Sequence, residues 1–407
     1  MLLLLAIILM VISGDPVNSG SVSNLRQVHL LFRHGARTPC DLYPTDPYKD
    51  PAYWPVGLGQ LTNEGKRMHF ELGQWLRQRY DGFLSENYSE QEILVRSTDV
   101  DRALMSAQSN LAGLYPPSGY WQWNTHLSWQ PIPVHTMPLS MDTRLSTKHT
   151  ECPRLDEKKK MLKTSPYMKT VFSDNKPLID YISAHSGWNV QTINQLDFIY
   201  DALLVEAQNN LTLPLWAHKV FPGGQFEKLR NLAFLTDTWD EEMQRLQAGP
   251  FMIELMSHLD AVIKQSPTRK LFMYSGHDVT ISFVLNSLGV FNNLPPPYAS
   301  LVIFELLYQG DWYVQISYRN NTMVEPYILT IPGCQQLCPL PMFKELTQRL
   351  RPGNWAGECQ GRQGMKADQS VFLLFILVSA VVICPVFLII VLTIKNYYSR
   401  RSYFQRL

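Results

Sequence analysis

The apolar residues of this 407-residue chain fall into short runs, and several of these runs are followed by a segment with helical spacing. Residues 25–32 alternate between polar and apolar and then become continuously apolar, a pattern that predicts a buried strand. Residues 62–80 carry apolar side chains every three or four positions behind Thr62, a candidate N-cap, so they are predicted to form a helix. The same order of strand, polar loop and helix recurs at residues 93–95 with 103–114 and at residues 270–274 with 279–288.

Strands that alternate with helices indicate an α/β fold, and we predict a mainly parallel central sheet with helices on both faces. In such sheets the loops at the carboxyl ends of the strands carry the functional site. Residues 301–307 and 312–318 alternate around Gln309-Gly310-Asp311, which predicts a hairpin.

The middle of the chain has a different character, because helical patterns dominate residues 145–260. We predict that these residues form a helical lateral (cap) domain. This division leaves an α/β core in two parts, residues 21–144 and 261–351, and a polar stalk over residues 352–370.

Both ends of the chain are strongly apolar. Residues 1–20 begin with an apolar run too short to span a bilayer and continue with small residues, which predicts a secretory signal peptide. Residues 371–394 carry no charged side chain and are long enough to form a transmembrane helix. Basic residues follow in the tail, 395–407, so we expect a single-pass type I membrane protein with a lumenal or extracellular body. A buried core helix and a GPI signal are the alternatives for the apolar span.

Three Asn-x-Ser/Thr sequons, at Asn87, Asn210 and Asn320, fit a body that passes through the secretory pathway, and we expect glycosylation there. The formal net charge is only +1, and the body carries no basic stripe, so no nucleic-acid partner is expected.

Four of the six cysteines are candidates for disulfides, which an oxidising compartment favours over thiols. Cys334 and Cys338 are close enough for a local loop, which leaves Cys152 and Cys359 for a long-range disulfide. This pairing is one of three possible. A zinc site is the alternative, but no second closely spaced pair supports it.

Positive charge gathers directly after the first predicted strand, in Arg33-His34-Gly35-Ala36-Arg37-Thr38-Pro39. A guanidinium has a fixed fork of donors that matches phosphate oxygens, so Arg33 and Arg37 are candidate phosphate ligands. After the strand at 93–95, Arg102 and Arg96 compete for the same role. His34 is the candidate nucleophile, because a neutral imidazole can form a covalent phosphoryl intermediate.

A second charged pair, His277-Asp278, follows the strand at 270–274. Asp278 is the candidate general acid for a leaving alcohol, and an unperturbed pKa near about 4 predicts that its carboxyl is protonated at acid pH. His277 is a candidate donor to a phosphate oxygen. Alternatives without chemistry are a core histidine at His34, a salt bridge of Arg102 at a helix start, and an N-cap at Asp278.

These residues together resemble the histidine acid phosphatase family. The likeness rests on residues 33–39 with Gly276-His277-Asp278, and on residues 96–107 and 131–135, which are similar to the branch of lysosomal and prostatic acid phosphatases. The resemblance implies an α/β core with a helical lateral domain, and hydrolysis of phosphate monoesters without a metal or any cofactor. It implies these roles: nucleophile, His34; proton donor, Asp278; phosphate ligands, Arg33, Arg37, Arg102 and His277.

The resemblance also implies a homodimer, because Trp129 and His135 fall in the segment that family members use for pairing. One departure is Ala36, which stands where many members have Asp. Another is the tail, which has no apolar residue three positions after Tyr403 and so shows no tyrosine-based lysosomal sorting signal.

The expected function is therefore acid phosphatase activity through a phosphohistidine, at the cell surface, in the lysosome or elsewhere in the secretory pathway. Three other enzymes remain open, a mutase of the same superfamily, a phytase-like enzyme and a lipid-phosphate phosphatase. The non-enzymatic alternative is a membrane-anchored binding glycoprotein with an inactive pocket.

Overall fold

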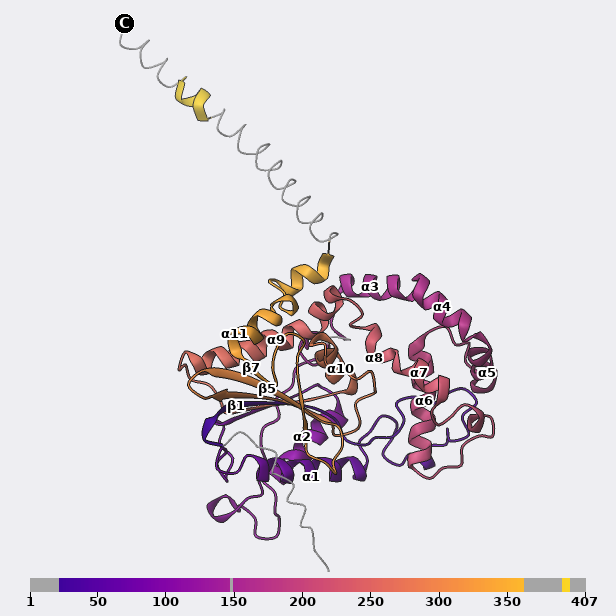
Figure 1. Cartoon of the computed structure of the whole chain (residues 1–407), viewed down its shortest axis with the longest axis horizontal. Helices are drawn as coiled ribbons and strands as arrows, with labels where there is room; N and C mark the ends of the chain where they lie inside the picture. Colours follow the sequence, from indigo (N-terminus) through magenta and orange to yellow (C-terminus); the bar gives the residue numbers. More distant parts are fainter. Residues whose placement is uncertain (1–21, 147–148, 362–389, 396–407) are drawn as a thin grey trace, which may run out of the picture. The chain divides into compact units, whose positions relative to one another are not determined.

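The computed structural model describes residues 22–146, 149–361 and 390–395 (Figure 1). The chain divides into two compact units. The first comprises residues up to 151 together with 159–352, and the second comprises residues 152–158 together with those from 353 onward.

The first unit is built on a seven-stranded mixed sheet with the order β2-β3-β1-β4-β5-β6, in which β7 also pairs with β5. The pairs β2–β3 and β3–β1 are parallel, and the other four pairs of this sheet, including β1–β4, are antiparallel. The prediction of an α/β fold is confirmed, but the prediction of a mainly parallel sheet is wrong. The strands are β1 (Leu25–Arg33), β2 (Ile93–Ser97), β3 (Leu271–Gly276), β4 (Leu301–Tyr308), β5 (Trp312–Arg319), β6 (Tyr327–Leu329) and β7 (Leu337–Pro339).

The segment between the third predicted helix and the hairpin explains the antiparallel half of the sheet. Residues 288–300 carry the chain back to the carboxyl end of β1, so that Leu301 pairs with Phe32 and β4 runs against β1. The predicted hairpin is confirmed as β4 and β5. The alternation of strands and helices in the sequence does not reveal at which end of the sheet such a connection begins the next strand. That end decides whether the next strand is parallel or antiparallel to its neighbour.

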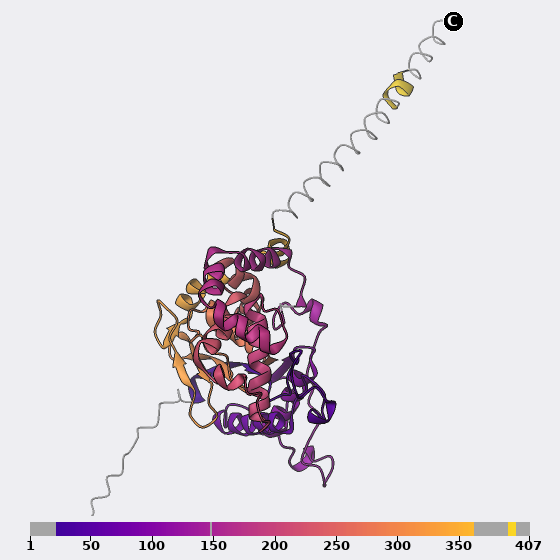
Figure 2. The same ribbon diagram turned by 90° about the vertical axis from the view of Figure 1, so that its right-hand side faces the viewer.

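Helices cover both faces of the sheet (Figures 1 and 2). Along β1 the side chains of Val28, Leu30 and Phe32 enter one apolar cluster with α1 and α2, whereas Leu31 enters another with α9 and α10. The helices are α1 (Asn63–Arg79), α2 (Asp101–Leu114), α3 (Pro153–Lys163), α4 (Pro166–Asp174), α5 (Lys176–Ser186), α6 (Ile193–Gln208), α7 (Gly224–Asn231), α8 (Ala233–Thr236), α9 (Glu241–Ile263), α10 (Asp278–Ser287) and α11 (Leu340–Leu346).

Helix α1 begins as predicted, because the Thr62 hydroxyl accepts a hydrogen bond from the backbone N–H of Gly65 at 3.1 Å. It crosses α2 at very short range through two glycines. A Cβ atom on Gly73 would lie 2.0 Å from the carbonyl oxygen of Asn110, and one on Gly113 would lie 2.1 Å from that of Phe70. This close crossing holds the two helices, and the loops that precede them, in one position.

Helices α4 to α7 pack around a third apolar cluster, to which Tyr43 from the first part of the chain also belongs. Helix α9 crosses residue 260, the predicted end of the lateral domain. Its residues Phe251, Met252 and Leu255 belong to the cluster on the sheet, so the end of the predicted lateral domain packs with the core. The division into core and lateral domains is otherwise a prediction.

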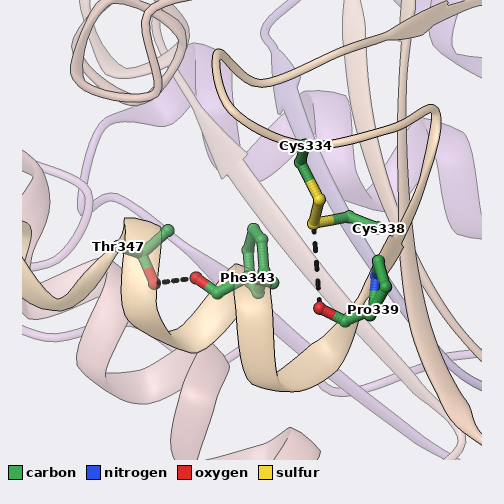
Figure 3. Close-up of a disulfide and its surroundings, with 5 residues drawn as sticks. All are labelled: Cys334, Cys338, Pro339, Phe343 and Thr347. Carbon is green, nitrogen blue, oxygen red and sulfur yellow. Dashed lines mark hydrogen bonds between the residues drawn. A yellow bond between two sulfur atoms is a disulfide. The ribbon is translucent and has the colours of Figure 1, made fainter.

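Both predicted disulfides are confirmed. Cys334 and Cys338 close a short loop ahead of α11, with the Cys338 sulfur 3.8 Å from the carbonyl oxygen of Pro339 (Figure 3). At the C-terminal end of α11, the hydroxyl of the C-cap residue Thr347 donates to the carbonyl of Phe343 at 2.7 Å. Cys152 and Cys359 form the other disulfide within the second unit.

The predicted stalk and termini are only partly described. Residues 355–361 of the predicted stalk are helical, residues 352–354 lead into this helix, and residues 362–370 lie outside the described residues. The predicted signal peptide, 1–20, and almost all of the predicted span, 371–394, also lie outside them. Among the described residues, no helix has the length and apolar character needed to cross a membrane.

A buried pair of carboxyl groups joins α6 to the loop after residue 38. Glu206 is fully buried and Asp46 is 5% exposed, and two negative charges held so close together in a buried place repel each other, so one of the two carboxyl groups carries a proton. Burial, with the neighbouring Asp46, raises the pKa of Glu206 to about 9. The folded protein therefore holds a proton that an unfolded glutamate would release near about pH 4.3.

We expect this pair to make the protein less stable as pH rises. A raised folded pKa contributes full stability below the unfolded value and loses it between about pH 4.3 and 9, at about 1 kcal/mol per pH unit. In Glu206→Gln this loss should largely disappear, because the amide donates to Asp46 at every pH. Urea unfolding at pH 5 and 8 measures both slopes, with the exposed Glu64→Gln as control. Parallel slopes for wild type and Glu206→Gln would contradict the assignment.

Candidate active site

The carboxyl ends of the three parallel strands bring the predicted motifs together. Arg33 at the end of β1 pairs with Gly276 at the end of β3, and the backbone N–H of His34 donates to the carbonyl of Gly276 at 3.1 Å. On the other side of β3, the backbone N–H of Thr98 donates to Ser275 at 3.1 Å. Sequence segments that are far apart therefore meet at one sheet edge, as parallel strands require.

The His34 ring is neutral and has a defined tautomer. Its Nδ1 lies 2.8 Å from the carbonyl oxygen of Gly35, and because a carbonyl only accepts, Nδ1 carries the proton and Nε2 keeps its lone pair. Burial lowers the pKa of His34 well below its usual range, and the nearby positive charges of Arg33 and Arg102 lower it further. His34 therefore presents an uncharged nitrogen beside cationic groups.

Gly35 holds this histidine against the start of α1. A Cβ on Gly35 would lie 2.2 Å from the carbonyl oxygen of Gly65, so no other residue fits. Its N–H donates to the Ser106 hydroxyl on α2 at 3.0 Å, and the carbonyl of Ala36 accepts from the Thr62 hydroxyl at 3.0 Å. Ala36 thus contributes backbone contacts to this loop.

Arg33 and Asp278 form a buried ion pair. The Arg33 Nη2 lies 2.7 Å from Oδ2 of Asp278, its Nη1 donates to the carbonyl of Pro296 at 2.7 Å, and its guanidinium lies 4.1 Å from the ring centre of Tyr298. Burial alone would raise the pKa of Asp278, but the charges of Arg33 and Arg37, with the hydrogen bond from Val279, together outweigh burial and lower the pKa to about 2. The expectation that an unperturbed pKa leaves Asp278 protonated at acid pH is therefore wrong for this arrangement.

Asp278 is also the first residue of α10 rather than its N-cap, a position that His277 occupies. The Oδ1 atom of Asp278 accepts from the backbone N–H of Val279 at 2.8 Å. The capping alternative for Asp278 is therefore wrong by one residue, and its carboxylate still benefits from the positive end of the helix.

Arg37 has a carboxylate partner that the sequence did not reveal. Its two Nη atoms donate to the two oxygens of Asp201 on α6 at 2.9 and 3.0 Å, a bidentate pair. Burial opposes the charge of Arg37, but Asp201 outweighs it and the pKa of Arg37 is raised. The signal in the sequence was the spacing of Asp197 and Asp201, which puts two carboxylates one turn apart on one helix face.

Arg102 lies in the same region, and among the described residues no carboxylate lies within ion-pair distance of its guanidinium. Its Nη1 donates to the carbonyl of Gly59 at 3.2 Å, and burial lowers its pKa. The competing Arg96 points elsewhere, because its Nη1 pairs with Oε2 of Glu254 on α9 at 2.9 Å. The structure thus separates the two candidates.

His277 lies beside His34, with 5.5 Å between the ring centres. Its Nε2 lies 3.0 Å from the Thr98 hydroxyl at the end of β2. Burial and the charge of Arg102 lower the pKa of His277 to about 3, so the ring is neutral here.

A cavity of about 190 Å³ opens above these residues. Its inner part contains five of the six predicted site residues: His34, Arg37, Arg102, His277 and Asp278. Arg33 does not line it and lies behind Asp278. The outer wall comes from α6, α7 and α8, a contribution that sequence reasoning missed. Residues on this wall are Asn194, Asp197, Phe198, Asp201, Arg230, Ala233, Phe234 and Asp237.

A neutral imidazole among arginines, at the carboxyl edge of an α/β sheet, is an arrangement whose charge suits a phosphoryl group. Residues 24–324 match the histidine phosphatase superfamily (branch 2), and the chain belongs to this family. The prostatic acid phosphatase of Rattus norvegicus is 42% identical over 360 residues, covering 87% of this chain and 93% of that protein. The lysosomal acid phosphatase of Homo sapiens is 40% identical over 376 residues, covering 91% and 87%.

Solved structures support the same fold. The phytase of Hafnia alvei in complex with tartrate has a TM-score of 0.62 at 17% identity and covers 83% of this chain and 98% of its own. The phytase of Citrobacter braakii has a TM-score of 0.60 at 17% identity and covers 83% and 99%. At this identity the likeness concerns the fold alone.

The variant Asp201→Asn tests whether the Asp201 carboxylate compensates the buried positive charge of Arg37. Without the carboxylate the buried guanidinium loses its counter-ion, so we expect unfolding to become easier by about 3 kcal/mol. Inorganic phosphate should restore more stability to this variant than to wild type, because it supplies the missing negative charge. Melting curves with and without phosphate measure this, with the exposed Asp180→Asn on α5 as control. A smaller phosphate effect in Asp201→Asn would overturn the compensating role.

Proposed function

We propose that this protein is an acid phosphatase that hydrolyses phosphate monoesters through a phosphohistidine at His34. The observation that carries the proposal is the neutral His34 ring, whose Nε2 keeps its lone pair. The ring centre lies 5.5 Å from that of His277, and the charges of Arg33, Arg37 and Arg102 surround the ring. The prostatic and lysosomal acid phosphatases at 40–42% identity support the same activity.

The arginines bind the phosphoryl group and neutralise the charge that its oxygens carry during transfer. Arg37 and Arg102 face the cavity directly. His277 adds a donor, which the Thr98 hydroxyl orients at 3.0 Å. Arg33 has two roles in this proposal. It lowers the pKa of Asp278, with which it forms an ion pair, and it attracts the negative charge of the phosphate.

The proton for the leaving alcohol arrives with the substrate. A phosphate monoester is a monoanion below about pH 6 and so carries one proton on its phosphoryl oxygens. When the phosphoryl group binds, its charge competes with Asp278 for Arg33 and raises the pKa of Asp278 from about 2, so the proton passes to that carboxylate. Acid operation thus follows from the substrate's ionisation.

Two displacements complete the reaction. The Nε2 lone pair of His34 forms a bond to phosphorus while the bond to the leaving oxygen breaks, and Asp278 transfers its proton to that oxygen. A water oxygen then attacks phosphorus, the phosphorus–nitrogen bond breaks, and Asp278 takes a proton from the water. Inorganic phosphate leaves and His34 is neutral again. No step needs a metal or a cofactor.

We extend the proposal to the setting of the enzyme. The relatives support a lysosomal or secreted location, and the apolar span 371–394 supports a type I membrane anchor. The exposed side chains of Trp129 and His135 support pairing into a homodimer. Among the sequons Asn210 is exposed, whereas Asn87 and Asn320 are half-buried, so Asn210 is the best-placed acceptor for a glycan.

His34→Ala should abolish turnover of phosphate monoesters, because it removes the nitrogen that forms the bond to phosphorus. The measurement is the hydrolysis rate of the ectodomain on a phosphomonoester panel from pH 4 to 8, with EDTA present. Alkaline quench of wild type with a labelled substrate should also trap a base-stable phosphohistidine at His34. The exposed His126→Ala is the control. Label retained in His34→Ala, or a rate that requires added metal, would reject the proposal.

Asp278→Asn should slow poor leaving groups far more than good ones. An alkyl alcohol needs a proton as it departs, so we expect losses of about 10²–10⁴-fold on glycerol 2-phosphate and much smaller losses on 4-nitrophenyl phosphate. Steady-state rates on both substrates measure the difference, with Asp101→Asn at the exposed start of α2 as control. Equal losses on the two substrates would exclude the general-acid role.

A further inference from the structure

The outer wall of the cavity carries several charges, yet each of them has a partner. Arg230 is the only positively charged residue that α6, α7 and α8 contribute to the described cavity lining. Its Nη2 lies 2.8 Å from Oδ1 of Asp197, and the side chains are 8% and 26% exposed. The guanidinium also lies over the rings of Tyr200, at 4.9 Å, and Phe234, at 5.5 Å, so it is held in place.

The other carboxylates of the wall are compensated in the same way. Asp201 forms the bidentate pair with Arg37, and Asp237 pairs with Lys159 at 3.2 Å. The other side chains of the lining are of both kinds, with the apolar Phe198, which is 39% exposed, and the polar Ser146, His149 and Asn194. A leaving group that enters the cavity therefore meets only paired charges from α6, α7 and α8, together with apolar and polar side chains.

We propose that the Asp197–Arg230 pair sets the leaving-group specificity of this site. Asp197 masks the one guanidinium on the outer wall, so the cavity takes monoesters whose alcohol portion is neutral or cationic and disfavours those that carry a second anionic group. This inference rests on the proposed function and narrows its substrate class. It argues against polyphosphorylated substrates, which need free cations on the leaving-group side.

The neutralisation of Arg230 depends on the negative charge of Asp197. Burial raises the pKa of this carboxyl to about 6, although Arg230 works in the opposite direction, and the charges of Asp201 and Asp278 add to the rise. Below about pH 6 Arg230 therefore becomes uncompensated and the discrimination weakens. The charged or titratable groups that share the cavity with Asp197 are Asp201, Arg230, Asp237, Asp278, Arg37, Arg102, His34, His149 and His277.

The test uses substrates that differ in one charge. These are 4-(carboxymethyl)phenyl phosphate, which is anionic, and 4-(carbamoylmethyl)phenyl phosphate, which is neutral and of the same shape. At pH 7 wild type should prefer the neutral ester in kcat/KM. In Asp197→Asn, which keeps a hydrogen-bond acceptor for Arg230, the anionic-to-neutral ratio should rise about tenfold. From pH 7 to 5 this ratio should rise in wild type and stay flat in the variant.

Arg230→Gln supplies the opposite arm, because it leaves Asp197 unpaired, and its anionic-to-neutral ratio should fall below that of wild type. Asp180→Asn, outside the cavity, should behave as wild type. An unchanged ratio in Asp197→Asn at pH 7, or equal pH trends in the two proteins, would overturn the inference even if hydrolysis itself proceeds normally.

A binding measurement separates this inference from the proposed function. Calorimetry with the corresponding benzylphosphonates, one carboxylated and one carbamoylated, reports the same affinity ratio without turnover. If wild type hydrolyses neither ester, the proposed function fails, and the affinity ratio in Asp197→Asn still decides the specificity. An affinity ratio that rises about tenfold supports the neutralising role of Asp197, and an affinity ratio that does not change rejects that role.

Discussion

The ion pair between Arg33 and Asp278 is the interaction on which the site depends. Guanidinium groups that converge on a buried ring repel one another, and a buried charge without a partner is costly. Two carboxylates reduce this cost, Asp278 at Arg33 and Asp201 at Arg37, each within 3.0 Å. The arginine cluster can therefore exist before any phosphate arrives.

The same pairing explains how the site can change its charge during a reaction. Arg33, with other nearby positive charges, holds Asp278 ionised with a pKa of about 2. In the proposed mechanism a bound phosphoryl group competes for the Arg33 guanidinium and lets this carboxylate take up a proton. The binding of phosphate and the protonation of the leaving group would then be coupled through one guanidinium.

The sheet edge and the lateral helices divide the work. The edge formed by β1, β3 and β2 carries the histidines and arginines, because parallel strands bring their following loops together. Helices α6 to α8 line the same cavity with Asp197, Asp201 and Arg230. In the proposed function the sheet edge binds the phosphoryl group that all monoesters share, and the helices contact the alcohol portion in which substrates differ.

Sequence alone determined much of this protein, because strand period, helix capping and the charged clusters after three strands are local properties. They were sufficient for the positions of β1, α1, β3 and the hairpin, and for the residues His34, Arg37, His277 and Asp278 at one edge, whereas the disulfide pairing was one of three that the sequence allowed. Tertiary structure decided what depends on the path of the chain between elements. The return of residues 288–300 set the antiparallel half of the sheet, and the packing of α6 supplied Asp201 and Asp197. Even the charge of Asp278 was decided there, since a pKa depends on which groups lie within a few ångströms and not on neighbours in the sequence.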